Sequence, residues 1–263
     1  MGVYAELGRR AADVRPMEQE PDPDKDIARR LMAALQQDEF VLYAQSIVPL
    51  VPRVDTRAFR EIYVRFSEED AKLLPPGTFF PVLQECHMLP YLDRWVVNRL
   101  ARWVRGGLKV MPAWKVPQCN VNLSDETLVD ASFADYVLKY VDHSFLSGGV
   151  LGFDISVDSA VANREPLQRL MAKLRPYGCT LTIAGFDGNE KMLPLLKALA
   201  PHYIKISAAS IDPAKVADVN RICHALGAKT IAEHVENTLV LEHLRRSQID
   251  FGQGFAISPV EAL

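Results

Sequence analysis

Short apolar segments typical of β-strands alternate with amphipathic segments typical of α-helices along most of this chain. The helical segments repeat apolar residues every three or four positions, whereas the strand segments are shorter apolar or alternating runs. Strands that alternate with helices of about ten residues form a parallel sheet, and roughly eight such strands predict a closed barrel. The fold class is therefore α/β, a (β/α)8 barrel of the TIM type. The expected strands are 40–48, 60–66, 119–123, 150–156, 181–184, 203–206, 230–233 and 249–252.

The first 25 residues differ in pattern from the rest. Residues 1–17 predict a short helix, and residues 18–25 (EQEPDPDK) have the proline and acidic content of a linker. Asp26 is a candidate N-cap for a helix whose apolar residues recur on one face. The sequence therefore predicts an N-terminal helix and linker at 1–25 and one domain at 26–263.

Composition narrows the function classes. The chain has 263 residues, of which 49% are hydrophobic, and this supports a large core. Its formal net charge of −3 gives no electrostatic basis for a nucleic-acid partner. The four cysteines lack CxxC spacing, so we expect reduced thiols in a cytoplasmic protein. No run of about 18 apolar residues is present, so we expect a soluble protein without a membrane partner.

Polar residues close several of the expected strands. Because the carboxyl ends of barrel strands converge at one rim, these side chains predict a shared site there. Amide and carboxylate oxygens with a lysine suit a hard cation and a nearby phosphate. Each residue alone has an ordinary structural explanation, since polar groups at strand ends often satisfy loop backbone. The residues are Asn122, Asp154, Lys205, Glu233 and Gln253.

Several motifs in the same order resemble the EAL domain, a bacterial phosphodiesterase that linearises cyclic di-GMP on a modified TIM barrel. The resemblance runs from about residue 26 to 259 and includes the strand 61–65 (EIYVR), which stands where the Glu-Ala-Leu signature is expected. The other matching segments are 40–47 (FVLYAQSI), 76–81 (PGTFFP), 120–124 (NVNLS), 204–207 (IKIS), 232–236 (AEHVE) and 253–255 (QGF).

The resemblance implies a set of cyclic di-GMP contacts. Arg65 is expected to form a bidentate contact with a phosphate, or instead a salt bridge with Glu61 on the same strand face. Tyr63 is expected to stack on a base or to block it. His234 replaces a family glycine and lies beside two carboxylates, which makes it a candidate ligand or pH-sensitive group, but we interpret it as a solvated loop residue. The expected ligand-binding residues are Gln45, Glu61, Tyr63, Arg65, Phe79, Phe80, Asn122, Asp154, Lys205, Glu236 and Gln253.

The departures from the family pattern lie in the segment 178–186. Ala184 and Gly185 stand where the family has its two metal-binding aspartates, and Asp154 stands for a glutamate. Hydrolysis with two metals needs carboxylates that hold both ions. The sequence therefore predicts a degenerate phosphodiesterase: no enzyme, no cofactor and no bound metal, with Glu61, Asn122, Asp154 and Glu233 as a vestigial ligand set.

Two hypotheses for function follow. The first is a catalytically inactive cyclic di-GMP receptor, a regulatory module of second-messenger signalling in motility or biofilm formation. The alternative is an EAL-like interaction module that no longer binds the nucleotide and regulates a partner protein directly. The resemblance also implies a homodimer.

Overall fold

The computed structural model describes residues 23–51, 57–67, 73–74, 76–141, 146, 149–207 and 212–263. The predicted helix at 1–17 and most of the predicted linker lie outside these residues. Helix α1 (Pro23–Gln36) begins three residues before the predicted cap, so Asp26 is a residue of the helix and the N-cap prediction is wrong.

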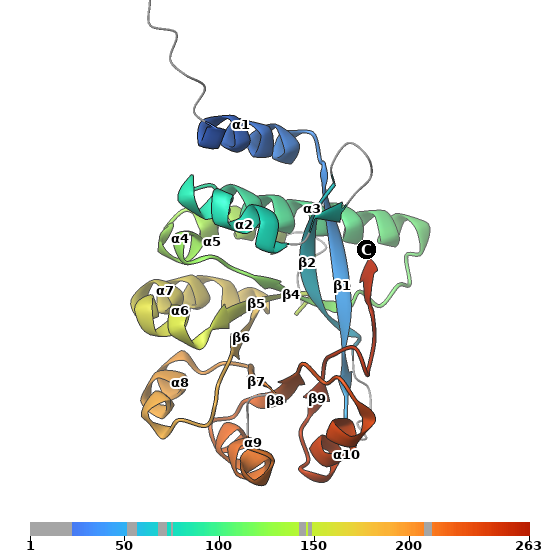
Figure 1. Ribbon diagram of the computed structural model, residues 1–263, viewed down its shortest axis with the longest axis vertical. Coiled ribbons are helices and arrows are strands. Elements are labelled where there is room, and N and C mark those ends of the chain that lie inside the picture. Colours follow the sequence, from blue (N-terminus) through green and yellow to red (C-terminus); the bar gives the residue numbers. More distant parts are fainter. Residues whose placement is uncertain are drawn as a thin grey trace, which may run out of the picture.

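A closed sheet forms the centre of the molecule, surrounded by helices (Figure 1). Its strands follow the order β10-β1-β9-β8-β7-β6-β5-β4-β2-β3, and an additional β1–β2 pairing closes the ring. The strands are β1 (Phe40–Pro49), β2 (Phe59–Ser67), β3 (Leu73–Leu74), β4 (Gln118–Asn122), β5 (Leu151–Ser156), β6 (Thr180–Ala184), β7 (Tyr203–Ser207), β8 (Lys229–Glu233), β9 (Phe251–Gly252) and β10 (Val260–Ala262).

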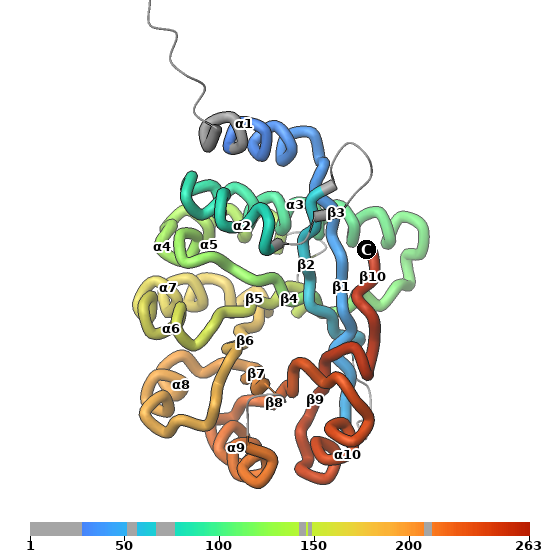
Figure 2. Tube along the Cα trace, in the orientation of Figure 1, coloured from blue at the N-terminus to red at the C-terminus, as the bar shows by residue number. Residues whose placement is uncertain are grey.

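Within the closed ring from β1 to β9, β1 runs against the other strands, and this distinguishes the sheet from a regular TIM barrel. Strand β1 pairs antiparallel with both β2 and β9, whereas the neighbouring pairs from β2 to β9 are parallel. Strand β10 adds to the other side of β1, so the C-terminal residues run beside the N-terminal strand (Figure 2). The predicted modified (β/α)8 barrel is confirmed.

Helices follow most of the parallel strands and cover the outside of the barrel (Figure 1). The sequence predicted the longer helices but not α4, α5 and α6. Helices α4 and α6 are short, and each begins at a serine whose hydroxyl accepts a hydrogen bond from the first turn. After α1 the helices are α2 (Pro76–Glu85), α3 (Leu89–Val110), α4 (Asp125–Val129), α5 (Phe133–Val141), α6 (Val157–Ala162), α7 (Arg164–Leu174), α8 (Leu193–Leu199), α9 (Val216–Ala225) and α10 (Thr238–Arg246).

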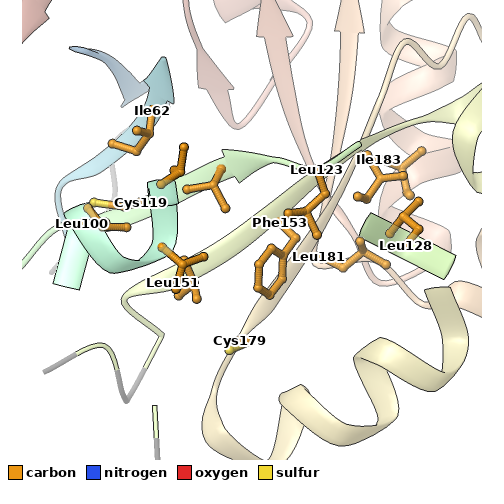
Figure 3. Packing of buried hydrophobic residues seen from close by; sticks show 14 of the residues in the cluster. Ile62, Leu100, Cys119, Leu123, Leu128, Leu151, Phe153, Cys179, Leu181 and Ile183 are labelled. Atoms are coloured by element: carbon orange, nitrogen blue, oxygen red, sulfur yellow. The ribbon is translucent and has the colours of Figure 1, made fainter. Parts of the chain in front are cut away.

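The main core lies between the outer face of the barrel and the helices. Figure 3 shows Phe153 and Leu181 on neighbouring strands, near Leu128 of α4. The buried thiols Cys119 and Cys179 belong to the same cluster, and burial raises the pKa of each to about 12, so both stay protonated at neutral pH. All four cysteines are free, in agreement with the sequence prediction.

A smaller apolar cluster closes the inside of the barrel at the amino ends of the parallel strands. It contains Ile47, Phe59, Ile231 and Phe251, with Tyr203 packed against it. The rings of Phe59 and Tyr203 lie 5.0 Å apart between centroids. Because this end of the barrel is filled, polar groups inside it reach solvent only at the opposite, carboxyl rim.

In the described part of the chain, no helix is long and apolar enough to cross a membrane.

Candidate functional site

A buried ammonium group lies at the centre of the carboxyl rim. The Nζ atom of Lys205, on β7, is 2.5 Å from Oε2 of Glu61 on β2 and 2.7 Å from Oδ2 of Asp154 on β5. It also lies 3.9 Å from Oε2 of Glu233, at the end of β8. Four strands therefore bring their charged side chains to one point, and three of these residues, Asp154, Lys205 and Glu233, belong to the predicted strand-end set.

The charges of this cluster depend on one another. Burial disfavours the ammonium of Lys205, but Asp154 and Glu61 more than offset it and raise the pKa of Lys205. Burial also disfavours the Glu61 carboxylate, yet Lys205 and hydrogen bonds hold the pKa of Glu61 below its ordinary value. For Asp154, burial together with the neighbouring Glu61 charge outweighs Lys205 and raises the pKa to about 6. Both groups next to Lys205 are thus mainly ionised at neutral pH.

Neutral polar groups complete the surroundings of Glu61. Asn122 Nδ2 donates to Glu61 Oε1 at 3.0 Å, and Gln253 Nε2 donates to Glu61 Oε2 at 2.7 Å. The Tyr63 hydroxyl donates to the same Oε2 at 3.1 Å and accepts from Gln253 at 2.9 Å. Burial and the nearby Glu61 charge raise the pKa of Tyr63, so its hydroxyl keeps its proton. Glu61 is therefore held in one orientation at the carboxyl rim.

A pocket of about 210 Å³ opens above this network. We call it the rim pocket. It joins strands β1, β2 and β8 and the turn after β9. Five of the predicted ligand-binding residues line it, together with four others. The lining residues are Gln45, Glu61, Tyr63, Glu233, His234, Glu236, Gln253, Gly254 and Phe255.

Phe79 and Phe80 were both predicted to contact the ligand, but the structure places their side chains in different surroundings. Phe79 is buried in the core, with its ring 5.4 Å from that of Phe40, and cannot stack on a ligand without leaving it. Phe80 is half-buried and lines a neighbouring pocket of about 270 Å³ that Asn122 also reaches. Of the two, Phe80 is the side chain placed to contact a ligand.

Arg65 does not pair with Glu61 in the structure. Glu61 pairs with Lys205, and Arg65 Nη1 instead donates to the carbonyl of Val64 at 2.9 Å. The guanidinium carbon lies 5.8 Å from the ring centroid of Tyr43 and 5.9 Å from that of Tyr63. Such cation–π contacts hold a guanidinium in place while leaving its other N–H groups able to bind an anion. Lys205, by contrast, has its ammonium buried among carboxylates and does not face the pocket with a free charge.

The side chains at the rim do not fit a pair of divalent cations. Ala184 and Gly185 offer no side-chain oxygen, and the Lys205 ammonium already lies among the remaining carboxylates. In the ranges that the structure describes, no group of three or more His, Cys, Asp or Glu side chains is arranged to hold a metal ion. Asp154 Oδ1 is nevertheless buried without a hydrogen-bond partner among these residues, so the cluster keeps one unused oxygen.

The sequence analysis assigned no ligand contact to three residues of the rim pocket, His234, Gly254 and Phe255. Phe255, a residue that is 74% exposed, is the last residue of the matching segment 253–255. His234 lines the pocket with a left-handed backbone, φ 59°, a conformation that costs a residue other than glycine about 1–2 kcal/mol. The signal for His234 was present as a histidine in a glycine position.

Gly254 is required by the wall of the rim pocket. A Cβ atom at this position would lie 2.3 Å from the backbone N and O atoms of Val235, and the φ of 152° is itself unfavourable for a side chain. We expect Gly254→Ala to lower the free energy of unfolding by about 2–4 kcal/mol, since neither backbone can yield easily. Gly106→Ala in the exposed C-terminal part of α3, where nothing lies within 4 Å, should instead raise it by about 0.5–1 kcal/mol. Urea unfolding of both variants measures these changes. An unchanged free energy of unfolding in Gly254→Ala would contradict the close packing of Gly254 on Val235.

Solved structures and curated proteins resemble this chain over most of its length. The EAL domain of FimX from Xanthomonas citri, solved in complex with c-diGMP, superposes with a TM-score of 0.81 at 19% identity, covering 92% of this chain and 95% of that one. The cyclic di-GMP phosphodiesterase PdeB of Shewanella oneidensis is 24% identical over 90% of this chain. PdeF of Escherichia coli, also named a cyclic di-GMP phosphodiesterase, is 26% identical over 89% of it. This chain covers only 28% and 32% of the lengths of PdeB and PdeF.

These relatives correct one prediction. The sequence predicted that the protein is not an enzyme, and this is wrong: PdeB and PdeF, which the chain resembles over nearly its whole length, are named phosphodiesterases. The prediction gave the residues at 184 and 185 too much weight. The rim retains Glu61, Asp154 and Lys205 in direct contact, so the site keeps charged groups despite those substitutions.

Three predictions about the domain are not tested by these comparisons, whereas the family is. The cytoplasmic location, the homodimer and the boundary at residue 26 stay predictions. The family is tested directly, because the profile of the EAL domain matches residues 28–260, most of the described chain. The superposition on the EAL domain of FimX agrees with that match. The chain belongs to the EAL domain family.

Proposed function

We propose that this domain binds cyclic di-GMP in the rim pocket and acts through this nucleotide in second-messenger signalling. The observation that carries the proposal is the convergence of Gln45, Glu61, Tyr63, Glu236 and Gln253 on one pocket. The resemblance to the EAL domain implies each of these residues as a nucleotide contact. FimX, whose EAL domain has the same fold, is bound to this nucleotide in its solved structure, which supports the choice of ligand.

The groups around the pocket suit a cyclic dinucleotide. Arg65 offers a planar guanidinium for a phosphate, and Phe80 offers a ring near the neighbouring pocket. The carboxylate of Glu236 and the amide of Gln45 can accept and donate hydrogen bonds at the edges of a base. The relatives' named activity makes hydrolysis of the phosphodiester the reaction to assay together with binding.

Calorimetry with the purified chain tests the proposal. We expect micromolar binding of cyclic di-GMP and at least about tenfold weaker binding of cyclic di-AMP, which lacks the guanine amino groups. Chromatography of the same samples shows whether the linear dinucleotide forms. Absence of binding, in EDTA and with Mg²⁺ or Ca²⁺, would contradict the proposal and favour the alternative of a protein-interaction module.

The affinity should depend little on divalent cations. Lys205 places a positive charge among Glu61 and Asp154, where a cation would otherwise act, and positions 184 and 185 supply no oxygen ligand. We expect the dissociation constant to change by less than about threefold between EDTA and millimolar Ca²⁺, a difference below about 0.7 kcal/mol. It should rise with added salt, because attraction of phosphates in an open cleft is screened. A gain of about tenfold with Ca²⁺ would show that the cluster still assembles a cation site.

A further inference from the structure

His234 differs from every other left-handed residue besides glycine in the described chain. The other such residues lie one or two positions after α1, α2, α8 or α10, where a left-handed residue commonly ends a helix. His234 instead follows Glu233, the last residue of β8, with φ 59°. The helix-ending residues are Asp38, His87, Ala200 and Gln248.

The surrounding backbone fixes this conformation. Val235 N donates to the carbonyl of Gln253 at 3.0 Å, and the carbonyl of Val235 accepts from Ala256 N at 3.0 Å. Gly254 packs directly on the backbone of Val235. Both the N–H and the carbonyl group of Val235, the residue after His234, are thus hydrogen-bonded to the turn after β9. Glycine would adopt the left-handed conformation at position 234 without steric cost, whereas histidine cannot.

No contact of the His234 side chain with the described residues offsets the cost of its left-handed backbone. Its side chain is exposed, and among the described residues it has no recorded hydrogen bond, ion pair or ring contact. It does line the rim pocket, beside Glu233, Glu236 and Phe255. Residues that the surrounding structure holds in a strained conformation are concentrated at ligand sites. The conformation therefore points to a ligand as the partner of the imidazole.

The charges of the rim pocket indicate which part of a ligand His234 meets. Glu61, Glu233 and Glu236 line the pocket, while the Lys205 ammonium below it is buried and paired. These carboxylates repel a phosphate at the mouth of the pocket, so its binding there depends on N–H donors such as the imidazole. A hydrogen bond to a charged oxygen is stronger than one between neutral groups. The imidazole of His234 carries such a donor in its neutral form.

We propose that His234 is a ligand-contacting residue whose ring N–H donates to a phosphate oxygen of the bound cyclic dinucleotide. This inference rests on the proposed function. It makes His234 a determinant of affinity specific to this chain, since the family pattern has glycine there. The hydrogen bonds of Val235 impose the left-handed conformation, and the ligand contact accounts for a histidine at a position where glycine would be unstrained.

Three substitutions separate affinity from stability. His234→Gly removes both the donor and the strain, so it should raise the midpoint of thermal unfolding and weaken cyclic di-GMP binding by about tenfold. His234→Ala removes the donor but keeps the strain, so it should bind equally weakly without the gain in stability. His234→Asn keeps an N–H donor and tolerates the left-handed region, so its affinity should stay within about threefold of the unaltered chain.

The outcomes distinguish this inference from the proposed function. Tight binding by the unaltered chain with unchanged affinity in His234→Gly and His234→Ala would overturn the role of His234 alone. Loss of affinity in His234→Asn as large as in His234→Gly would overturn the hydrogen bond as its cause. No binding by the unaltered chain would overturn the proposed function and this inference together. Calorimetry gives the affinities, and thermal unfolding without ligand gives the stabilities.

Discussion

Lys205→Met should lower the free energy of unfolding of this domain by about 3–5 kcal/mol, the range for removing one partner from a buried ion pair. The Lys205 side chain is only 2% exposed and lies between Glu61 and Asp154. Methionine fills a similar volume but leaves both carboxylates buried without a counter-ion. Their desolvation is then uncompensated, and this outweighs the gain from an additional apolar side chain.

The loss of stability in Lys205→Met should become smaller as the pH falls. Without Lys205, burial raises the pKa of Glu61 and Asp154 in the folded state above that in the unfolded chain. A carboxyl group with a raised folded-state pKa destabilises the fold above its unfolded pKa, and this cost disappears as the pH falls and the group binds a proton. The variant should therefore be closer to the unaltered protein at pH 5 than at pH 8. Urea unfolding at both values measures this.

A surface pair on the same protein provides the control. Lys173 Nζ lies 2.9 Å from Asp135 Oδ1, but both side chains are at least half exposed. Lys173→Met should therefore cost no more than about 1 kcal/mol. Adding Asp154→Asn to Lys205→Met should recover part of the loss, since it removes one of the two unpaired charges. Equal effects of Lys205→Met and Lys173→Met would show that the cluster is hydrated and not buried.

The barrel was predictable because each strand is recognisable from the apolar or alternating residues of its own short segment. Each expected strand occurs in the structure, although β9 is limited to Phe251–Gly252. Glu61 and Tyr63, two residues apart, share the inner face of β2, as the alternation of a strand requires. The short helices α4 and α6 were missed because five or six residues are too few for a helical period to appear.

The partners of side chains in the site were less predictable. The strand-end pattern places Lys205 at the rim, but only the closed ring shows that its ammonium lies between Glu61 and Asp154 and not in the pocket. The two phenylalanines of α2 are adjacent, so they point in different directions: Phe79 packs in the core and Phe80 lines a pocket. Such assignments depend on contacts between segments that are far apart in sequence.

Arg65→Ala should weaken binding of cyclic di-GMP more than any other single change outside the buried cluster. The guanidinium of Arg65 is held over the rings of Tyr43 and Tyr63, and Tyr63 lines the rim pocket. Loss of a hydrogen bond to a charged phosphate costs about 1.5–3 kcal/mol, equivalent to a roughly ten- to hundredfold higher dissociation constant. The fold should tolerate the change, because Arg65 makes no buried ion pair in the described part of the chain.

Two further arginine variants show whether this effect comes from the planar guanidinium at the rim. Arg65→Lys keeps the charge but loses the paired N–H groups, so its affinity should fall between those of Arg65→Ala and the unaltered chain. Arg60→Ala alters a residue of the same strand on the opposite face, and its affinity should change by less than about twofold. Calorimetry at one fixed salt concentration compares the three. If Arg65→Ala and Arg60→Ala bind equally well, the phosphates of the nucleotide lie elsewhere on the rim.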